Sequence, residues 1–377
     1  MDRFQGILNT LSEEDNLRSL RSGIPGGKYI DYGGRRYVNM SSNDYLGLAG
    51  DTDMQRRFLA EMAGSGEFLM SSSASRLMTG NSPVNDALEE SIAVLYPGKS
   101  ALILGNGYMV NSGCLPALVG KRDLVVADKL VHASLIDGLR LCDCDWTRFN
   151  HNDMDQLETI LKKRRSEYEE VWVVTESVFS MDGDLAPLAG LVELKKRYGL
   201  RLYVDEAHAF GVLGPNGSGY AASIGCDRDI DVIVGTFGKA LASYGAFAAL
   251  DPVMRDVLIN RMRTVIFSTG LPPIVMSWTK WLVDRLPEFE PRRRHLRELI
   301  DALVPDNPAA THIVPVPAGE NAAAVAMSDK FRECGFWTTP IRWPTVPKGR
   351  ARVRVSLTAA MDMTDIEKFK EIWNSIG

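Results

Sequence analysis

The sequence predicts an α/β protein with a large, mostly parallel sheet and a smaller C-terminal α+β domain. Two observations carry this prediction. From about residue 85, short apolar runs that end in a polar residue or glycine alternate with amphipathic helical stretches. This alternation is typical of a parallel sheet buried on both faces by helices. Near the C-terminus, residues 351–359 alternate as a strand does, and a helical pattern follows them.

The expected elements follow one another from the N-terminus in a simple order. Residues 3–22 are amphipathic and predict a helix, and residues 29–40 predict a hairpin that turns at Gly33 and Gly34. Short apolar runs predict the strands of one sheet, namely 101–105, 123–128, 171–176, 201–206 and 231–236. Helical patterns between these strands occupy residues 154–168 and 188–199.

The chain is long enough for more than one hydrophobic core. Its 377 residues predict two main domains. We expect an N-terminal helix and hairpin segment at 1–44, a large α/β domain at 45–272 and a small α+β domain at 273–377. The second boundary is set by the segment LPP, which breaks the chain after residue 270.

The net charge and the cysteine pattern argue against several kinds of partner and site. A net charge of −5 and a pI near 5.7 argue against a nucleic-acid or membrane-surface partner, because both normally require a basic face. The five cysteines are scattered, and the two closest, Cys142 and Cys144, lack the neighbours of a metal site. No apolar run has the length of a signal peptide or a membrane span. We therefore expect a cytoplasmic protein without a metal, in which the thiols are reduced.

The stretch VIVGTFGKALASYGAF (Val232–Phe247) holds one lysine, Lys239, among apolar and small residues. One interpretation is structural, with the side chain lying along the surface and its ammonium in water. The other is chemical, because a partly dry lysine has a lowered pKa and its neutral amine condenses with carbonyls. Gly235, Gly238 and Gly245 would leave room for a bulky ligand. The stretch alone leaves both interpretations open.

Acidic residues close two of the predicted strands. Asp205 ends the run at 201–206, and His208 follows three residues later. A common role for such an aspartate is to cap a helix. At the mouth of a parallel sheet it could instead hold a heterocyclic nitrogen protonated, as pyridoxal phosphate requires to act as an electron sink. Glu176 closes the neighbouring run, and Ser180 follows it before a tight turn.

The glycine-rich segment GNGYMVNSG (Gly105–Gly113) follows another predicted strand. Its amide groups would open a helix suited to a phosphate. A dinucleotide fold would place a third glycine at position 110, where this chain has Val110. The segment therefore favours a single phosphate over a pyrophosphate. His132, just after the run that ends at Asp128, is either a satisfied core residue or a ring that stacks on a flat cofactor.

Taken together, these pieces resemble the pyridoxal-phosphate-dependent α-oxoamine synthases, which have the aspartate-aminotransferase-like fold (fold type I). The resemblance covers nearly the whole chain, and the order and spacing of its motifs are more specific than any one of them. The motifs are SSNDYLGLA, SRLMTGNSPVNDALEE, DKLVHASLIDG, HND, TESVFSMDGDLAPL, YVDEAHAFGVLGPNGSG, TFGKA and FSTGLPP.

The resemblance implies roles around a pyridoxal phosphate ring. Lys239 is the Schiff-base lysine, Asp205 is the partner of the pyridine nitrogen, and His132 stacks on the ring. His208 and Ser180 approach the phenolic oxygen of the cofactor.

The resemblance also implies a phosphate site and an assembly. The phosphate meets Gly107, Tyr108 and Thr236 of the same chain. Thr269 of the partner subunit reaches the same phosphate, because members of the family are homodimers with shared active sites.

For the substrates, the resemblance selects three residues. Arg354 holds the carboxylate of the amino acid, Asn43 lies beside the substrate, and Arg18 lies near the acyl chain. Alternation along the strand does not distinguish Arg354 from Arg352, so only the family pattern selects Arg354. The C-terminal segment TTPIRWPTVPKGRARVRVSLTAAMDMTDI resembles members that condense L-alanine with a pimeloyl thioester, carried by coenzyme A or an acyl carrier protein.

Two alternatives stay open at this point. One is a sister synthase that uses glycine with acetyl-CoA or succinyl-CoA, and the other is a nicotinamide-dependent oxidoreductase that shares only the α/β pattern. Three departures from the family pattern bear on acyl specificity, namely the segment Met70–Ala74, Trp343 and Met361.

Overall fold

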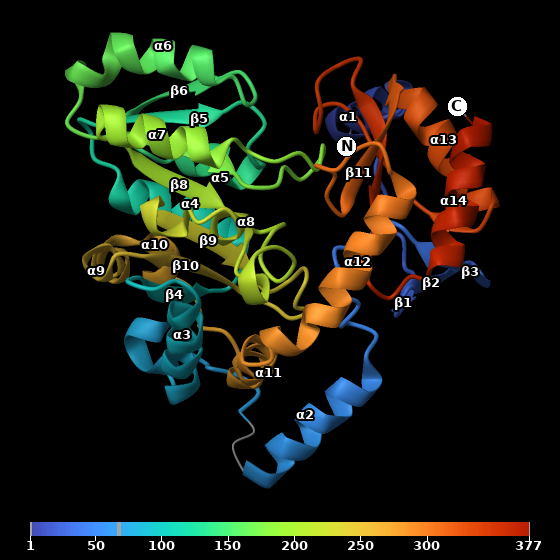
Figure 1. The fold of residues 1–377 in the computed structure, drawn as a ribbon, viewed down its shortest axis with the longest axis horizontal. Coiled ribbons are helices and arrows are strands. Elements are labelled where there is room, and N and C mark those ends of the chain that lie inside the picture. The colour runs from blue at the N-terminus through green and yellow to red at the C-terminus, as the bar shows by residue number, and fades with distance from the viewer. Residues whose placement is uncertain (1, 66–68, 377) are drawn as a thin grey trace. The chain divides into compact units, whose positions relative to one another are not determined.

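The computed structural model describes residues 2–65 and 69–376, which cluster into two compact units (Figure 1). The sheet unit comprises residues 52–65, 69–179 and 185–290. The terminal unit comprises residues 2–51, 180–184 and 291–376.

These units differ in two places from the expected division after residues 44 and 272. The N-terminal hairpin clusters with the C-terminal part of the chain, because strand β3 (Arg35–Asn39) pairs in parallel with β12 (Phe336–Trp337). Residues after 272 stay with the sheet unit, because they form helix α11 (Pro273–Val283), which packs against α3 (Pro83–Leu95).

The sheet unit is built on one mixed sheet, with seven strands within the described residues. Their spatial order is β4, β10, β9, β8, β7, β5 and β6. The strands are β4 (Ser100–Leu104), β5 (Leu124–Asp128), β6 (Asp145–Phe149), β7 (Val171–Glu176), β8 (Arg201–Asp205), β9 (Val232–Thr236) and β10 (Ala246–Leu250). β10 pairs antiparallel with β4 and β9, whereas the other neighbours pair in parallel. The predicted α/β class with a mostly parallel sheet is confirmed.

All the strands predicted for this sheet are present, with ends shifted by at most one residue. Two strands were missed. β6 has the sequence DWTRF and is a largely exposed edge strand, so its pattern lacks an apolar run. β10 begins within the glycine-containing stretch around Lys239, where small residues give a weak strand pattern.

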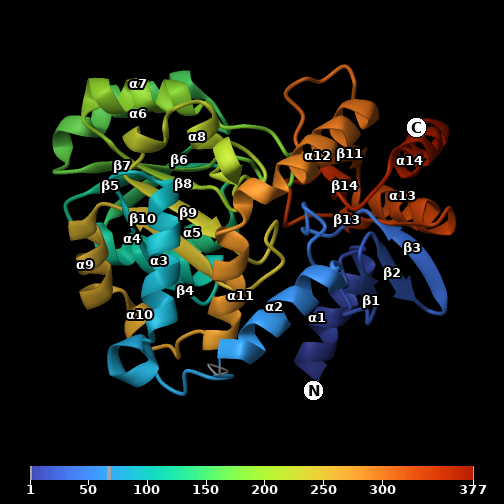
Figure 2. The same ribbon diagram turned by 60° about the horizontal axis from the view of Figure 1, so that its bottom comes forward.

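Helices cover the sheet on both faces. The further helices of this unit are α2 (Thr52–Ser65), α4 (Gly107–Leu118), α5 (Ala133–Arg140), α6 (Met154–Arg164), α7 (Leu188–Tyr198), α8 (Tyr220–Ser223), α9 (Pro252–Arg261) and α10 (Arg263–Ile266). Helices α4, α5, α9 and α10 enclose the main hydrophobic core with one face of the sheet (Figure 1). Helices α3 and α7 contact the opposite face, with α11 beside α3 and α6 beside α7 (Figure 2). The predicted helices at 154–168 and 188–199 correspond to α6 and α7.

The terminal unit holds two small sheets within its described residues. One has the order β1, β2, β3 and β12, and the other has the order β11, β14 and β13. Its further strands are β1 (Ile24–Gly26), β2 (Tyr29–Tyr32), β11 (Ile313–Gly319), β13 (Thr339–Ile341) and β14 (Ala351–Ser356). Its helices are α1 (Asp2–Glu13), α12 (Glu290–Leu303), α13 (Asn321–Glu333) and α14 (Met363–Ile376).

The N-terminal predictions had mixed outcomes. The hairpin is confirmed as β2 and β3, and Gly33 and Gly34 turn it with φ of 59° and 77°, which glycine adopts without strain. The helix expected over 3–22 is wrong in length, because α1 ends at Glu13. Acidic residues at the C-terminal end of a helix oppose its dipole, and Asp15 has a left-handed φ of 51°, which ends the helix there.

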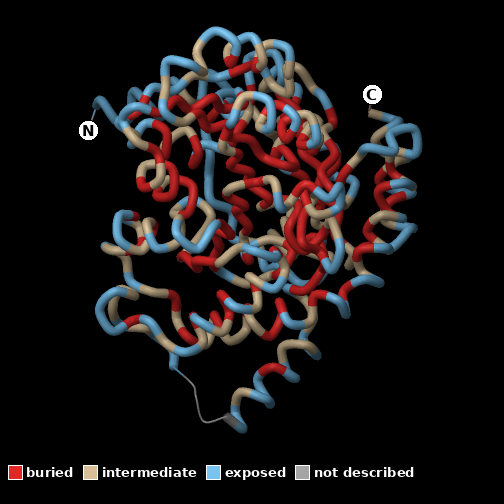
Figure 3. The backbone as a smooth tube through the Cα atoms, turned by 60° about the vertical axis from the view of Figure 1, so that its left-hand side comes forward, coloured by how far each residue is buried: buried red, intermediate tan, exposed pale blue. Residues whose placement is uncertain are grey.

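Buried residues, red in Figure 3, concentrate in the interior strands of the sheet. Every residue of β5, β7 and β10 is buried, as a strand covered on both faces requires. Within the part of the chain that the structure describes, no helix is long and apolar enough to cross a membrane. The five cysteines are all free thiols.

Candidate active site

The carboxyl ends of the parallel strands bring polar residues to one edge of the sheet. Glu176 ends β7, Asp205 ends β8 and Thr236 ends β9. Glu176 and Asp205 are direct partners in the register between β7 and β8. Because ligands of parallel sheets bind beyond this edge, it is the first place to look for a site.

Asp205 is buried and held by two donors. Its side chain is 6% exposed. Its Oδ2 accepts a hydrogen bond from Nδ2 of Asn111 at 2.7 Å, and its Oδ1 accepts one from the backbone N–H of Ala207 at 2.9 Å. The bond to Ala207 shapes the turn after β8, so the capping interpretation is partly correct. The bond to Asn111 adds a donor from another element, and together the two donors suit a buried ionised carboxylate.

Glu176 is a second buried carboxyl beside Asp205. Burial first, and then the charge of Asp205, raise the pKa of Glu176 to about 8. It accepts a hydrogen bond from the backbone N–H of His132. Its Oε1 is buried and has no hydrogen-bond partner among the described residues. Glu176 is therefore mostly neutral at pH 7.

His132 caps the start of α5. Its Nδ1 lies 2.7 Å from Oγ of Ser134 and accepts the backbone N–H of Ser134 at 3.3 Å. A nitrogen that accepts an N–H bond carries no proton itself, so the neutral ring has its proton on Nε2. Burial lowers the pKa of His132, although the nearby Asp205 acts in the opposite direction. The ring is thus a neutral, oriented surface near Asp205.

Lys239 follows β9 in a loop and meets His208. The distance between Nζ of Lys239 and Nε2 of His208 is 2.8 Å. His208 is buried, whereas Lys239 is half-buried. A Cβ placed on the neighbouring Gly238 would meet its nearest atom, Oγ1 of Thr236, only at 3.7 Å. The amine therefore lies beside a base that can exchange a proton with it, in a loop with open space next to it.

The N-terminus of α4 has the features of a phosphate site. Asn106 caps the helix by accepting the N–H of Met109 at 2.9 Å. The N–H groups of Gly107 and Tyr108 begin the helix and have no intrahelical acceptors. A Cβ on Gly107 would meet no atom within 4 Å, so this helix start faces open space. These amides fit a single phosphate, as does the local dipole.

Two side chains at this phosphate site have other contacts in the structure. The hydroxyl of Tyr108 bonds to Asp137. The backbone of Tyr108, and not its ring, therefore faces the helix start. The hydroxyl of Thr236 donates to the backbone oxygen of Gly245 at 3.1 Å and accepts the N–H of Gly238 at 3.3 Å. Within residues 2–65 and 69–376 there is no group of three or more His, Cys, Asp or Glu that could hold a metal ion.

In the terminal unit, Arg354 is a buried cation surrounded by neutral acceptors. It lies on β14 and is 8% exposed. Its Nε donates to the backbone oxygen of Ser180 at 2.6 Å, and its Nη1 donates to Ser356 Oγ at 2.6 Å and Asn43 Oδ1 at 3.2 Å. Among the described residues, its Nη2 bonds only to the hydroxyl of Tyr45, at 3.4 Å. The Nη2 end is therefore the least engaged part of this guanidinium.

Arg352 lies two residues earlier on the same strand and has a different environment. It forms an ion pair with Asp182. Arg354 has no ion pair with any described carboxylate, so its charge is left for an anionic ligand. The tertiary structure separates two arginines that alternation could not separate. Ser180, which the resemblance places near the cofactor, uses its carbonyl here to accept the bond from Arg354.

A second feature of the terminal unit is a basic cavity of about 560 Å³. It is lined by Arg18, Arg21, Arg332 and Arg342, with Asp329 as the one acidic residue among its lining residues. Burial, followed by the charge of Arg18, lowers the pKa of Arg342. Such crowded cations attract an anion. The apolar side of the cavity, formed by Leu17, Ile30, Val325, Pro340 and Ile341, suits a hydrocarbon chain.

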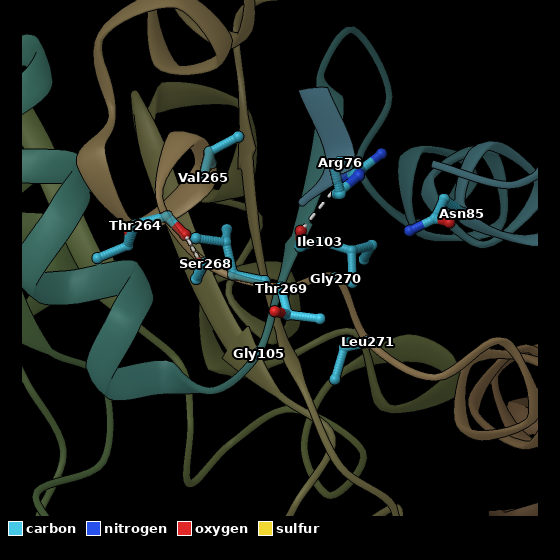
Figure 4. A pocket seen from close by; sticks show the side chains of 11 residues that line it. Arg76, Asn85, Ile103, Gly105, Thr264, Val265, Ser268, Thr269, Gly270 and Leu271 are labelled. Carbon is cyan, nitrogen blue, oxygen red and sulfur yellow. Dashed lines mark hydrogen bonds between the residues drawn. The ribbon is translucent and has the colours of Figure 1, made fainter. Parts of the chain in front are cut away.

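Thr269 lies in the segment between α10 and α11 of the sheet unit. It makes a backbone bridge with Ser75. Together with Arg76, Gly105 and Ser268 it lines a water-sized cavity of about 20 Å³ (Figure 4).

The sequence analysis missed Asn111, Ser134 and Tyr45. Asn111 is the most informative of these, because it is fully buried and bonds directly to Asp205. The signal for it was present, since Asn111 is a polar residue among the buried apolar positions of α4, beside Val110 and Cys114. A polar side chain on an apolar helix face needs a buried partner.

Comparison with known sequences gives a family. Residues 35–372 match the family described as aminotransferase class I and II. The chain is 47% identical to the 8-amino-7-oxononanoate synthase of Haemophilus ducreyi, and the match covers 97% of this chain and 98% of that protein. It is 45% identical to the 8-amino-7-oxononanoate synthase of Chlorobaculum parvum, with 97% of each chain covered.

Comparison with solved structures agrees on the fold. A serine palmitoyltransferase variant from S. paucimobilis, solved with a bound aldimine of pyridoxal phosphate and myriocin, matches with a TM-score of 0.90 and 25% identity, covering 100% of this chain and 97% of that one. The 8-amino-7-oxononanoate synthase of Francisella tularensis matches with a TM-score of 0.75 and 25% identity, covering 90% of this chain and 97% of that one.

The raised pKa of Glu176 makes stability depend on pH. The neutral carboxyl stabilises the fold fully below the ordinary pKa of 4.5, and this contribution is lost as pH rises through about 8. Glu176→Gln keeps the neutral form at every pH. We expect nearly equal free energies of unfolding for variant and wild type near pH 4.5, and an advantage of the variant on the order of 4 kcal/mol at pH 8.

Urea unfolding from pH 4.5 to 8.5 measures this difference. Glu193→Gln is the control, because Glu193 is an exposed residue of α7 and its replacement should leave no pH-dependent difference. A difference for Glu176→Gln that stays constant with pH would contradict the buried, mostly neutral carboxyl.

Proposed function

The chain belongs to the class I and II aminotransferase family, and we propose that within this family it is an 8-amino-7-oxononanoate synthase, which condenses L-alanine with a pimeloyl thioester. The products would be 8-amino-7-oxononanoate, carbon dioxide and the free thiol carrier, in biotin biosynthesis. The observation that carries the proposal is the identity of 45–47% with synthases of that name over nearly the full chain. The enzyme is an acyltransferase that uses pyridoxal 5′-phosphate.

The sheet unit provides residues that fit this cofactor. Pyridoxal phosphate supplies an electron sink for the charge that develops when bonds at the α-carbon of an amino acid break. Asp205, held by Asn111, would keep the ring nitrogen protonated, and His132 would stack on the ring. The amides of Gly107 and Tyr108 and the hydroxyl of Thr236 would hold the phosphate.

Lys239 and His208 would handle protons at the reacting carbon. Lys239 would hold the cofactor through its amine and remove the α-proton of alanine when that amine is free. The contact of 2.8 Å with Nε2 of His208 gives the amine a partner for proton exchange. The same pair would return a proton to the carbon after carbon dioxide leaves. We also propose that His208 and Ser180 approach the phenolic oxygen.

The terminal unit provides residues that fit the substrates. Arg354 would bind the carboxylate of alanine through the guanidinium edge that its neutral partners leave least engaged. Asn43 bonds to Nη1 of Arg354 and would orient it beside the substrate. Arg18, in the basic cavity with apolar walls, would lie near the acyl chain. An acyl chain with a terminal carboxylate matches this combination of charge and apolar surface.

We further propose a cytoplasmic homodimer in which Thr269 of the partner subunit reaches the phosphate. The free state of all five cysteines supports a reducing compartment.

An assay of the purified protein with a panel of substrates tests the activity. The panel pairs alanine, glycine or serine with pimeloyl, acetyl, succinyl or palmitoyl thioesters, on coenzyme A and on an acyl carrier protein. We expect carbon dioxide release with alanine and pimeloyl thioester, and its loss in Lys239→Ala with the fold retained. Preferred turnover of glycine would point to a sister synthase. An active Lys239→Ala variant would remove the proposed role of this lysine.

The two arginines of β14 give a matched pair for testing amino-acid binding. Arg354→Lys keeps the charge and loses the planar fork, so we expect alanine to bind about tenfold or more weakly. Arg352→Lys changes only a residue already paired with Asp182 and should bind alanine as the wild type does. Alanine titration, followed by the absorption of the bound cofactor, measures both. Equal affinities in the two variants would refute Arg354 as the carboxylate anchor.

Mixed dimers test the shared site. Lys239→Ala chains and Thr269→Val chains, each with low activity alone, should recover turnover when combined, because one site of the hybrid then has both wild-type residues. Sedimentation should show a mass of two chains of 41.6 kDa each. No recovery in hybrids, or a protein that sediments as a monomer, would contradict the shared site.

A further inference from the structure

A buried asparagine connects two of the residues proposed to face the cofactor ring. Asn111 lies on α4 and is 1% exposed. Its Nδ2 donates to Oδ2 of Asp205 at 2.7 Å and to Oγ of Ser134 at 2.9 Å. Its Oδ1 accepts the hydroxyl of Tyr203 at 2.8 Å. Ser134 and Tyr203 are fully buried as well, so water does not compete for these bonds.

The partners of Asn111 fix the direction of every bond in this network. The carboxylate of Asp205 only accepts, so the NH₂ group of the amide must face it, and the carbonyl must face Tyr203. Because Ser134 Oγ accepts from Asn111, its own proton is free to point toward Nδ1 of His132, 2.7 Å away. The network therefore runs from Asn111 in two directions, to a carboxylate and to an imidazole.

We propose that Asn111 is a positioning residue that sets the orientation of the Asp205 carboxylate and, by turning the Ser134 hydroxyl toward Nδ1, stabilises the neutral ring of His132. The inference rests on the proposed function for its purpose, namely a ring held between these two residues. The directions of the hydrogen bonds in this network do not depend on which cofactor binds.

The amide is suited to this task because it has two donors and one acceptor in one plane. An aspartate would offer no donor to Asp205 and would place a second charge beside it. A leucine would leave one oxygen of Asp205 without its donor and would free Ser134 to rotate. With its hydroxyl free to turn, Ser134 would no longer be held as a donor to Nδ1, which would keep only the backbone N–H of Ser134 as its donor.

Other groups also act on His132 and remain unchanged in the test. Asp205 and Asp137 raise its pKa, and Lys239 lowers it. Glu176 accepts the backbone N–H of His132. The loss of a donor to Nδ1 adds a separate effect, because that bond stabilises the neutral ring.

Two variants divide the network, and a third serves as control. Asn111→Leu breaks both branches, whereas Ser134→Ala breaks only the branch to His132. Asn85→Leu is the control, because Asn85 is also 1% exposed, and its side chain bonds to Ser82 at the start of α3. All three remove buried polar groups, so a loss of melting temperature by itself does not distinguish them.

The first measurement uses the cofactor-free protein. The ¹⁵N chemical shifts of the imidazole of His132, assigned with His132→Gln, report its tautomer and its pKa. We expect the wild type and Asn85→Leu to carry the proton on Nε2. We expect Ser134→Ala and Asn111→Leu to keep the backbone N–H of residue 134 as a donor to Nδ1, to weaken or lose the hydroxyl donor, and to raise the pKa of His132 by up to about one unit.

The second measurement is the dissociation constant of pyridoxal 5′-phosphate. We expect Asn111→Leu to weaken binding about tenfold or more through Asp205, and Ser134→Ala to stay within about threefold of the wild type. Unchanged His132 shifts in both Asn111→Leu and Ser134→Ala would overturn the proposal. If Asn111→Leu does not fold, unchanged shifts in Ser134→Ala alone would overturn it. A wild type that binds no pyridoxal phosphate would refute the proposed function, while the shifts would still decide the tautomer assignment.

Discussion

The register between β7 and β8 is the constraint on which the candidate site depends. It places Glu176 directly opposite Asp205, so two carboxyl groups are buried side by side at one edge of the sheet. Burial and a neighbouring carboxylate both disfavour the charged form of a carboxyl group, and hydrogen-bond donors favour it. Asp205 has Asn111 and Ala207 as donors, while Glu176 has an unpartnered Oε1 within the described residues and a pKa raised by burial and by its neighbour.

Helix α4 joins the two ends of this arrangement. Its first amides face open space at Gly107, and one turn later the same helix contributes the amide of Asn111 to the network beneath. The network reaches Ser134 because α4 and α5 pack unusually closely. A Cβ added at Gly138 of α5 would lie 2.5 Å from the backbone oxygen of Asn111, so only glycine allows this approach. Phosphate site, carboxylate and imidazole thus depend on one helix and on one glycine contact.

In the terminal unit, hydrogen-bond partners likewise surround a buried charge, which here is a cation. Arg352 and Arg354 share a face of β14, yet one is neutralised by Asp182 and the other is surrounded by carbonyl, amide and hydroxyl oxygens. Neutral acceptors satisfy the geometry of a buried guanidinium without cancelling its charge. The basic cavity around Arg18 and Arg342 shows the same excess of positive charge on a larger scale.

The sequence by itself determined the fold class, the five predicted strands and the ends at which Glu176, Asp205 and Thr236 lie, because buried parallel strands are continuous apolar runs with abrupt polar ends. Motif resemblance selected Lys239, His132 and His208 as site candidates, since their types and spacing are local properties. Neither the strand and helix patterns nor the motifs showed the short exposed strand β6, the end of α1 at Glu13, or the donors of Asp205. Only the tertiary structure decided strand β6, the donors of Asp205 and the difference between Arg352 and Arg354, because pairing, exposure and charge compensation depend on residues up to 311 positions away in the chain.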